Sequence, residues 1–177
     1  MLSDSEFDSR PLEHWDERET ESLETFYAQH HHRGAFLEFL VAASLVTSSQ
    51  SAATWLLKHS LEHGLEIGVE LRKNLFKSLP KLSTWPAKLH VLQCLQWLEI
   101  PARNKNQIER FGRSCLQDEN KFVRTWALTA LHRLAECHGE YTAEVTELLI
   151  DARDNGESAS LRARARQLLK KKLATRN

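Results

Sequence analysis

The sequence predicts an all-α protein built from stacked helical hairpins. Glycine and proline are scarce, with 6 Gly and 4 Pro in 177 residues, which favours long helices joined by short turns. Runs of alternating Val, Ile, Thr and aromatic residues, the usual sign of strands, are missing. Apolar residues instead recur with the 3.6-residue period of a helix. A compact helical bundle or another type of helical-hairpin repeat would use the same helices.

The acidic start of the chain, residues 1–33, predicts an N-terminal tail followed by a capping helix. From about Pro11 to His30 the apolar positions are diluted by glutamates, as in a helix whose outer face meets solvent. A stack of helix pairs needs such a cap, because an uncovered end would expose its core face. The run His30–His32 is interpreted as a polar turn, since neighbours on one turn do not converge on a metal ion.

Residues 34–177 predict a helical repeat domain. Its first segment, Ala35–Val46, is apolar almost all round, so we expect it to be the most buried helix. Turn residues, prolines and periodic apolar positions mark the helices that follow. These are Ser51–His63, Leu65–Leu79, a helix beginning at Trp85 and Pro86, a helix containing Ile108 and Leu116, Asp118–Leu134, Tyr141–Asp151 and Ser158–Leu173.

The segment Asp118–Leu134 shows the clearest helical pattern. Asp118 and Asn120 precede it, and either side chain could accept backbone N–H bonds at the helix start. Its apolar stripe is Val123, Ala127, Ala130, Leu131 and Leu134.

An internal repeat aligns this segment with three other helices. Ala53, Ala87, Val123 and Leu161 are separated by 34, 36 and 38 residues. A period in this range is typical of stacked helical hairpins, each of which buries its face against its neighbours. The same register aligns Leu57, Val91, Ala127 and Ala165, and also Leu61, Leu95, Leu131 and Leu169.

The residues at these positions resemble a HEAT repeat over about residues 35–173. The pattern has an acid in the turn, a Val-Arg pair, and Ala and Leu on the core face of the second helix. Asp118, Val123, Arg124, Ala127 and Leu131 fit it. The resemblance implies a right-handed α-solenoid of about four stacked antiparallel helix pairs. It also implies a structural role for the aligned bases Lys88, Arg124 and Arg162, which would pair with turn acids as a ladder between repeats.

Charge is distributed unevenly along the chain. Residues 1–70 hold 13 acids and 4 bases, a net charge of −9, whereas residues 71–177 hold 11 acids and 20 bases, a net charge of +9. One interpretation is two solvated surfaces, and the other is a basic half that meets an acidic partner. The same polarity would permit head-to-tail self-association, and the oligomeric state is otherwise unspecified.

Composition also bounds the location and the chemistry. The N-terminus lacks the apolar core of a secretory signal and Ala35–Val46 is shorter than a membrane span, so we expect a soluble cytoplasmic protein. Three cysteines, Cys94, Cys115 and Cys137, form an odd set without C-x-x-C spacing, which favours reduced core thiols. No Gly-rich phosphate loop is present, and no cofactor is expected.

The aligned second helices also indicate a candidate binding surface. One row contains Leu56, His90, Trp126 and Arg164, and a second row contains His63, Trp97, Arg133 and Lys171. Trp and Arg dominate binding hot spots, so we predict partner binding by His63, Trp97, Trp126, Arg133, Arg164 and Lys171. The alternative is that this flank packs against the first helices as ordinary core.

These observations predict a non-catalytic scaffold or adaptor that binds a protein or peptide. The alternative is nucleic-acid binding by the basic C-terminal helix, through Arg162, Arg166, Lys170 and Lys172. HEAT-like alkylpurine DNA glycosylases are a precedent, but their catalytic acid matches no residue here. The run His59–His63 fits the zinc-protease motif H-x-x-E-H, but it has no third ligand on a partner helix, so no enzyme is expected.

Overall fold

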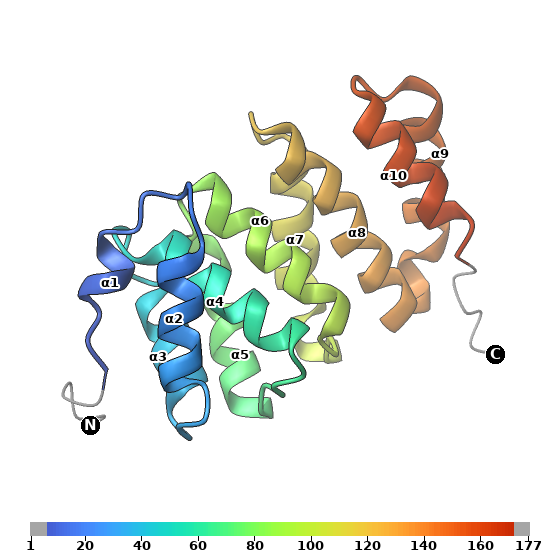
Figure 1. Cartoon of the computed structure of the whole chain (residues 1–177). Helices are drawn as coiled ribbons and strands as arrows, with labels where there is room; N and C mark the ends of the chain where they lie inside the picture. The colour runs from blue at the N-terminus through green and yellow to red at the C-terminus, as the bar shows by residue number, and fades with distance from the viewer. Residues whose placement is uncertain (1–6, 172–177) are drawn as a thin grey trace. The chain divides into compact units, whose positions relative to one another are not determined.

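All elements of the structure, a computed structural model that describes residues 7–171, are helical (Figure 1). This confirms the all-α prediction. The chain divides into two compact units, Met1–Val91 and Leu92–Asn177, and the division falls within α6 (Trp85–Cys94). The predicted boundary between residues 33 and 34 stays a prediction. Within the described residues, no helix is both long enough and apolar enough to cross a membrane.

Helix α4 is the centre of the first unit. It packs against α1, α2 and α3, and nine of its 13 residues are buried. The helices that precede and follow it in the chain are shorter than α4. The elements of this unit are α1 (Arg10–Glu13), α2 (Glu21–His30), α3 (Phe36–Ala43), α4 (Gln50–Glu62), α5 (Val69–Ser78), the 3-10 turn η1 (Leu79–Lys81) and the start of α6.

The prediction that Ala35–Val46 is the most buried helix is wrong. Helix α3 ends at Ala43, and Leu45 and Val46 are 44% and 52% exposed. The chain turns there because Ser49 Oγ donates to the carbonyl of Ala43 and Ser44 Oγ donates back to that of Val41.

The predicted helix from Pro11 to His30 is interrupted between α1 and α2. Glu17 has a φ of 64°, in the left-handed region, which a continuous helix does not allow. The turn is held by Trp15 Nε1, which donates to the Glu19 carbonyl, and by the Asp16 carboxylate, which accepts from Arg18 N–H. Local hydrogen bonds therefore replace the helical ones in this stretch.

Gln50 fixes the start of α4 beside the start of α6. Its side-chain amide donates to the carbonyls of Ser44 and Lys81, and its oxygen accepts the N–H groups of Ser83 and Thr84. Gln50 is fully buried, so these bonds satisfy groups that water cannot reach.

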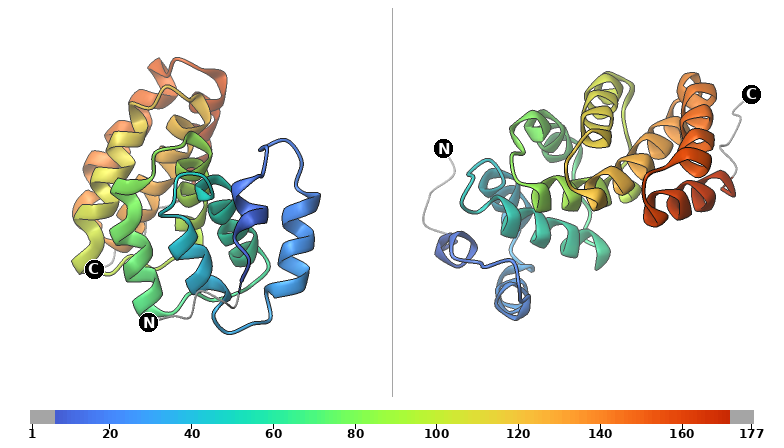
Figure 2. Two further views of the ribbon diagram at one scale, coloured as in Figure 1. Left: turned by 90° about the vertical axis from the view of Figure 1, so that its left-hand side faces the viewer. Right: turned by 90° about the horizontal axis from the view of Figure 1, so that it is seen from above.

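The second unit contains two helix pairs. Helix α7 packs on α8 and α9 packs on α10, while α8 and α10 also pack on each other (Figures 1 and 2). The elements are η2 (Leu95–Trp97), η3 (Ala102–Asn104), α7 (Lys105–Leu116), α8 (Lys121–Cys137), η4 (Gly139–Tyr141), α9 (Thr142–Asn155) and α10 (Ala159–Leu169).

The starts of α8 and α10 follow from their capping residues. Asn120 Oδ1 accepts the N–H of Phe122, and Asp118 Oδ1 accepts that of Asn120. Ser158 Oγ accepts the N–H of Leu161 in the same way. These bonds satisfy backbone donors that a helix start leaves open, as predicted for residues 118 and 120.

The repeat register predicts the core well. The whole predicted stripe of α8 is at most 1% exposed. Among the twelve aligned core positions, only Leu161 and Leu169 in the last helix are half-buried. Cys94 and Cys115 are buried and Cys137 is half-buried.

Candidate binding surface on the second helices

Most of the circumference of α8 is buried, and one face remains open. Phe122, Trp126 and Arg133 lie at i, i+4 and i+11, which places them on one side of the helix. Phe122 is 49% exposed, and Trp126 and Arg133 are half-buried. Lys121 Nζ lies 5.2 Å from the centre of the Phe122 ring. The open side of α8 therefore combines aromatic rings with cations.

Helix α10 contributes Arg164 to the same surface. The guanidinium carbon of Arg164 lies 4.1 Å from the centre of the Trp126 ring, a cation–π contact, and its NH1 donates to Gln167 Oε1 at 3.2 Å. Thr125 and Ser160 meet at 3.5 Å between their hydroxyl oxygens and help to align the two helices. Burial lowers the pKa of Arg164, although the ordinary value of arginine lies far above neutral pH.

Trp97, the last residue of η2, lies at the other end of the surface, just before a segment that is bonded to α8. Arg133 Nε donates to the Leu98 carbonyl at 3.3 Å, and His138 Nε2 donates to that of Ile100 at 2.8 Å. These bonds hold the segment along the C-terminal half of α8. Trp97 itself is 42% exposed.

Lys171 lies at the end of α10, close to buried His132. Burial lowers the pKa of His132, while nearby Glu136 and the backbone of Lys171 act in the opposite direction. Glu136 also accepts from Arg133 NH1 at 3.3 Å. The Lys171 side chain is exposed, so it adds a cation at this end of the surface.

Five of the six predicted partner-binding residues thus lie on η2, α8 and α10 or at their ends. Trp126 and Arg164 touch directly. His63 belongs to the first unit instead, where its ring lies 4.0 Å from that of His59 and 5.8 Å from Tyr27. We therefore restrict the candidate surface, called the second-helix surface below, to Trp97, Phe122, Trp126, Arg133, Arg164 and Lys171.

The aligned residues Leu56 and His90 in the first unit are core. Leu56 is fully buried and His90 is 8% exposed. His90 Nδ1 lies 3.2 Å from Thr54 Oγ1, and burial, aided by the charge of Lys58, lowers the pKa of His90 to about 3. For these two positions the alternative interpretation, a packed flank, is the right one.

The residues predicted for nucleic-acid binding fall into three groups. Arg162 donates from NH1 to the Gly156 carbonyl at 2.6 Å, in the turn before its own helix. Arg166 and Lys170 are exposed. Lys172 lies outside the described residues.

The predicted ladder residue Arg124 ties together the turns at the edge of the second unit. It donates to the carbonyls of Asp118 and Glu119 and forms an ion pair with Glu157 in the next turn. A surface pocket of about 440 Å³ at this edge includes Asp151 among its lining residues. Carboxylates therefore gather at the turns.

The side chains of the zinc-protease motif are engaged in other contacts. Glu62 accepts from Lys58 Nζ at 2.8 Å, and His63 Nδ1 donates to the His59 carbonyl at 2.8 Å. The ring of His59 packs against those of Tyr27 and Trp55. Within residues 7–171, no group of three or more His, Cys, Asp or Glu residues could hold a metal ion.

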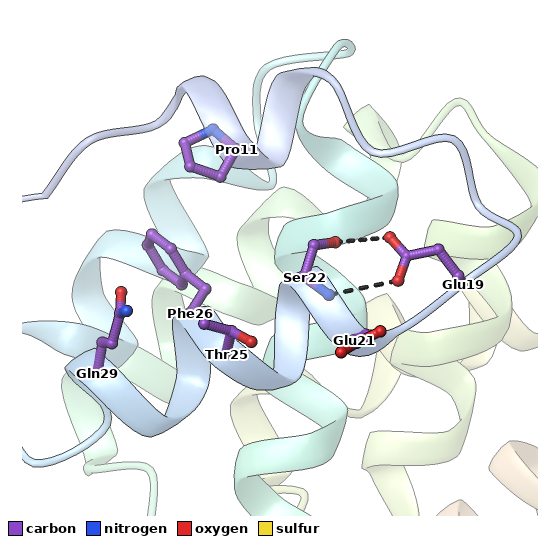
Figure 3. A pocket seen from close by; sticks show the side chains of 7 residues that line it. All are labelled: Pro11, Glu19, Glu21, Ser22, Thr25, Phe26 and Gln29. Atoms are coloured by element: carbon purple, nitrogen blue, oxygen red, sulfur yellow. Dashed lines mark hydrogen bonds between the residues drawn. The ribbon is translucent and has the colours of Figure 1, made fainter.

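Sequence reasoning missed two features. One is Phe122, whose position four residues before Trp126 on the same face was the available signal. The other is a pocket of about 430 Å³ beside α2, where Glu19 accepts from the Oγ and N–H of Ser22 (Figure 3). It is lined by Pro11, Glu19, Glu21, Ser22, Thr25, Phe26 and Gln29.

No protein-family profile, curated protein or solved structure matches the chain.

Proposed function

We propose that the chain is a non-catalytic, HEAT-like scaffold that binds a protein or peptide through the second-helix surface. In this proposal the helix pairs stack as a right-handed solenoid. The 34- to 38-residue repeat and the pairing of Arg124 with Glu157 in the next turn support it. A cytoplasmic location is part of the proposal, because three cysteines without C-x-x-C spacing favour reduced thiols.

The observation that carries the proposal is the composition of the open face of α8 and its neighbours. Trp97 and Phe122 are large aromatic residues with 42% and 49% of their surface exposed. They flank a Trp126–Arg164 stack that is already ordered. Aromatic and arginine side chains supply most of the energy at protein interfaces, because they combine contact area with directed donors.

The test is a pull-down from nuclease-treated lysate with wild-type protein and with the double variant Trp97→Ala/Arg133→Ala. We expect the variant to lose the retained partner while its circular dichroism stays unchanged. The matched control is Arg153→Ala, which removes an exposed cation paired with Asp154 on α9. A partner that the double variant retains as well as wild type does would remove this surface from consideration.

Nucleic-acid binding is the second candidate, because α10 and the two residues after it carry exposed Arg166, Lys170 and Lys171 and no acid. Cations that neutralise phosphates release counterions, so affinity would fall steeply as salt rises. Fluorescence anisotropy with a labelled single-stranded RNA at increasing NaCl tests this candidate. Binding that does not weaken with salt would exclude the mechanism.

A further inference from the structure

The cations of α10 are not neutralised by the described part of the chain. Within residues 7–171, Arg164, Arg166, Lys170 and Lys171 form no ion pair with a carboxylate. Other cations of this unit do have such partners, namely Lys105, Arg113, Arg124, Arg133 and Arg153. Because these pairing carboxylates lie on α7, α8, η4, α9 and the turn before α10, α10 keeps an uncompensated positive charge.

Arg164 is also held in a fixed orientation. Its guanidinium lies against the Trp126 ring, and NH1 is bonded to Gln167 Oε1. Residues 7–171 offer no hydrogen-bond acceptor to its Nε or NH2. A planar guanidinium presents its donors at its edges, in the geometry that suits the two oxygens of a carboxylate. The stack therefore orients Arg164 before any ligand arrives.

The cations and aromatic rings are spread along the surface. Trp126 and Arg133 are seven residues apart on α8, which corresponds to two turns and a rise of roughly 10 Å. Lys171 follows Arg164 by seven residues and lies two residues beyond the end of α10. Exposed Phe122 lies one further turn before Trp126 and offers an apolar contact.

We propose, on the basis of the proposed function, that the ligand of the second-helix surface is an acidic segment of another protein. Arg164 and Lys171 bind its carboxylates, and Phe122 contacts an apolar side chain of the same segment. Trp126 orients Arg164 and Gln167 restrains it.

A protein ligand fits this surface better than a nucleic acid. Single-stranded nucleic acids bind by stacking successive bases on a row of open aromatic faces, and Arg164 already stacks on Trp126, the ring between exposed Trp97 and Phe122. Glu136 lies beside Arg133 and would repel a phosphate backbone. Glu136 also lies beside His132, which is close to Lys171. A peptide can place an uncharged residue next to Glu136, whereas every nucleotide of a nucleic acid carries a phosphate.

The experiment selects binders from a phage-displayed library of random 12-residue peptides on the intact chain. We expect the selected peptides to be enriched in Asp and Glu together with an aromatic or aliphatic residue. For a synthesised, fluorescein-labelled selected peptide, we expect Arg164→Ala to weaken binding by at least about tenfold. Arg164→Lys should weaken it nearly as much, because lysine lacks the fork of donors.

The matched control is Arg166→Ala, which removes one positive charge two residues away on a different face of α10. It should change the affinity less than about twofold, since Arg166 does not face the peptide and an exposed charge away from the contact contributes little. An equal loss in Arg164→Ala and Arg166→Ala would mean binding by net charge alone and would overturn the inference.

Three other results would overturn it as well. These are selection of neutral or basic peptides, no enrichment at all, and tighter Arg164-dependent binding of a 20-nucleotide single-stranded RNA than of the acidic peptides. The proposed function survives these results if the lysate partner still depends on Trp97 and Arg133. It fails separately if that dependence is absent.

Discussion

The guanidinium of Arg164 lies over the indole of Trp126, with 4.1 Å between the guanidinium carbon and the ring centre. This contact joins the two second helices of the second unit across their exposed edge. It also places a cation and an aromatic ring at the middle of the surface to which we assign partner binding.

The Trp126–Arg164 contact should contribute measurably to folding. In a double-mutant cycle with Trp126→Ala, Arg164→Ala and the double variant, urea unfolding should give a coupling energy of about 0.5–1 kcal/mol, the range for a partly exposed cation–π pair. Additive single-variant effects would show that the two side chains do not interact in solution.

Burial of His90 should make the protein less stable in acid. The pKa of His90 is about 3 in the folded chain, below the ordinary value of 6.5, so the unfolded chain binds the proton more readily. The stabilisation is complete above pH 6.5 and declines as pH falls toward 3, with a slope of up to about 1.4 kcal/mol per pH unit. Urea unfolding from pH 7 to pH 4 measures it.

The His90→Gln variant removes this titration, so its stability should depend less on pH over the same range. His32→Gln, which changes an exposed histidine in the same unit, serves as the control and should behave as wild type does. An unchanged pH dependence in His90→Gln would contradict the assignment.

His63 should influence the protonation of His59. Their rings are 4.0 Å apart, and the pKa of His59 is lowered by burial and then by the charge of His63. The substitution His63→Gln should therefore raise the pKa of His59, as measured from its ring proton shifts by NMR. A lower or unaltered pKa of His59 would be inconsistent with this geometry.

Gln50 should be among the most sensitive polar positions. Gln50→Ala leaves the N–H groups of Ser83 and Thr84 and the carbonyls of Ser44 and Lys81 without their partner, so we expect a loss of about 2–4 kcal/mol in urea unfolding. Gln96→Ala changes an exposed glutamine and should cost less than about 0.5 kcal/mol. Similar losses in both variants would refute the role of Gln50.

The sequence predicted the second unit better than the first. The caps Asp118 and Asn120 and the stripe from Val123 to Leu134 follow from local chemistry and a clear period, and the structure has both. Between Pro11 and His30 the spacing of Leu12 and Leu23 fits a single helix. The break between α1 and α2 depends on the left-handed backbone conformation of Glu17, which composition does not reveal.

Only part of the candidate surface could be predicted, because the repeat pattern aligns residues without showing which of them are exposed. Aligning the repeats placed Trp126 and Arg164 in one row, and they meet in space. A helical wheel does not indicate which flank of a helix is exposed to solvent. Leu56 and His90 therefore fall in the same row as Trp126 and Arg164, although both lie in the core. That distinction depends on tertiary contacts such as Thr54 with His90.

Site-specific photo-crosslinking tests the central claim most directly. The photoreactive amino acid p-benzoylphenylalanine is placed at residue 122 on α8 or, as a control of similar exposure, at residue 150 on α9, where Phe122 and Ile150 are 49% and 40% exposed. We predict that irradiation in the source cells links residue 122, but not residue 150, to a defined protein. No protein adduct at residue 122, or the same adducts at both positions, would contradict partner binding by the second-helix surface.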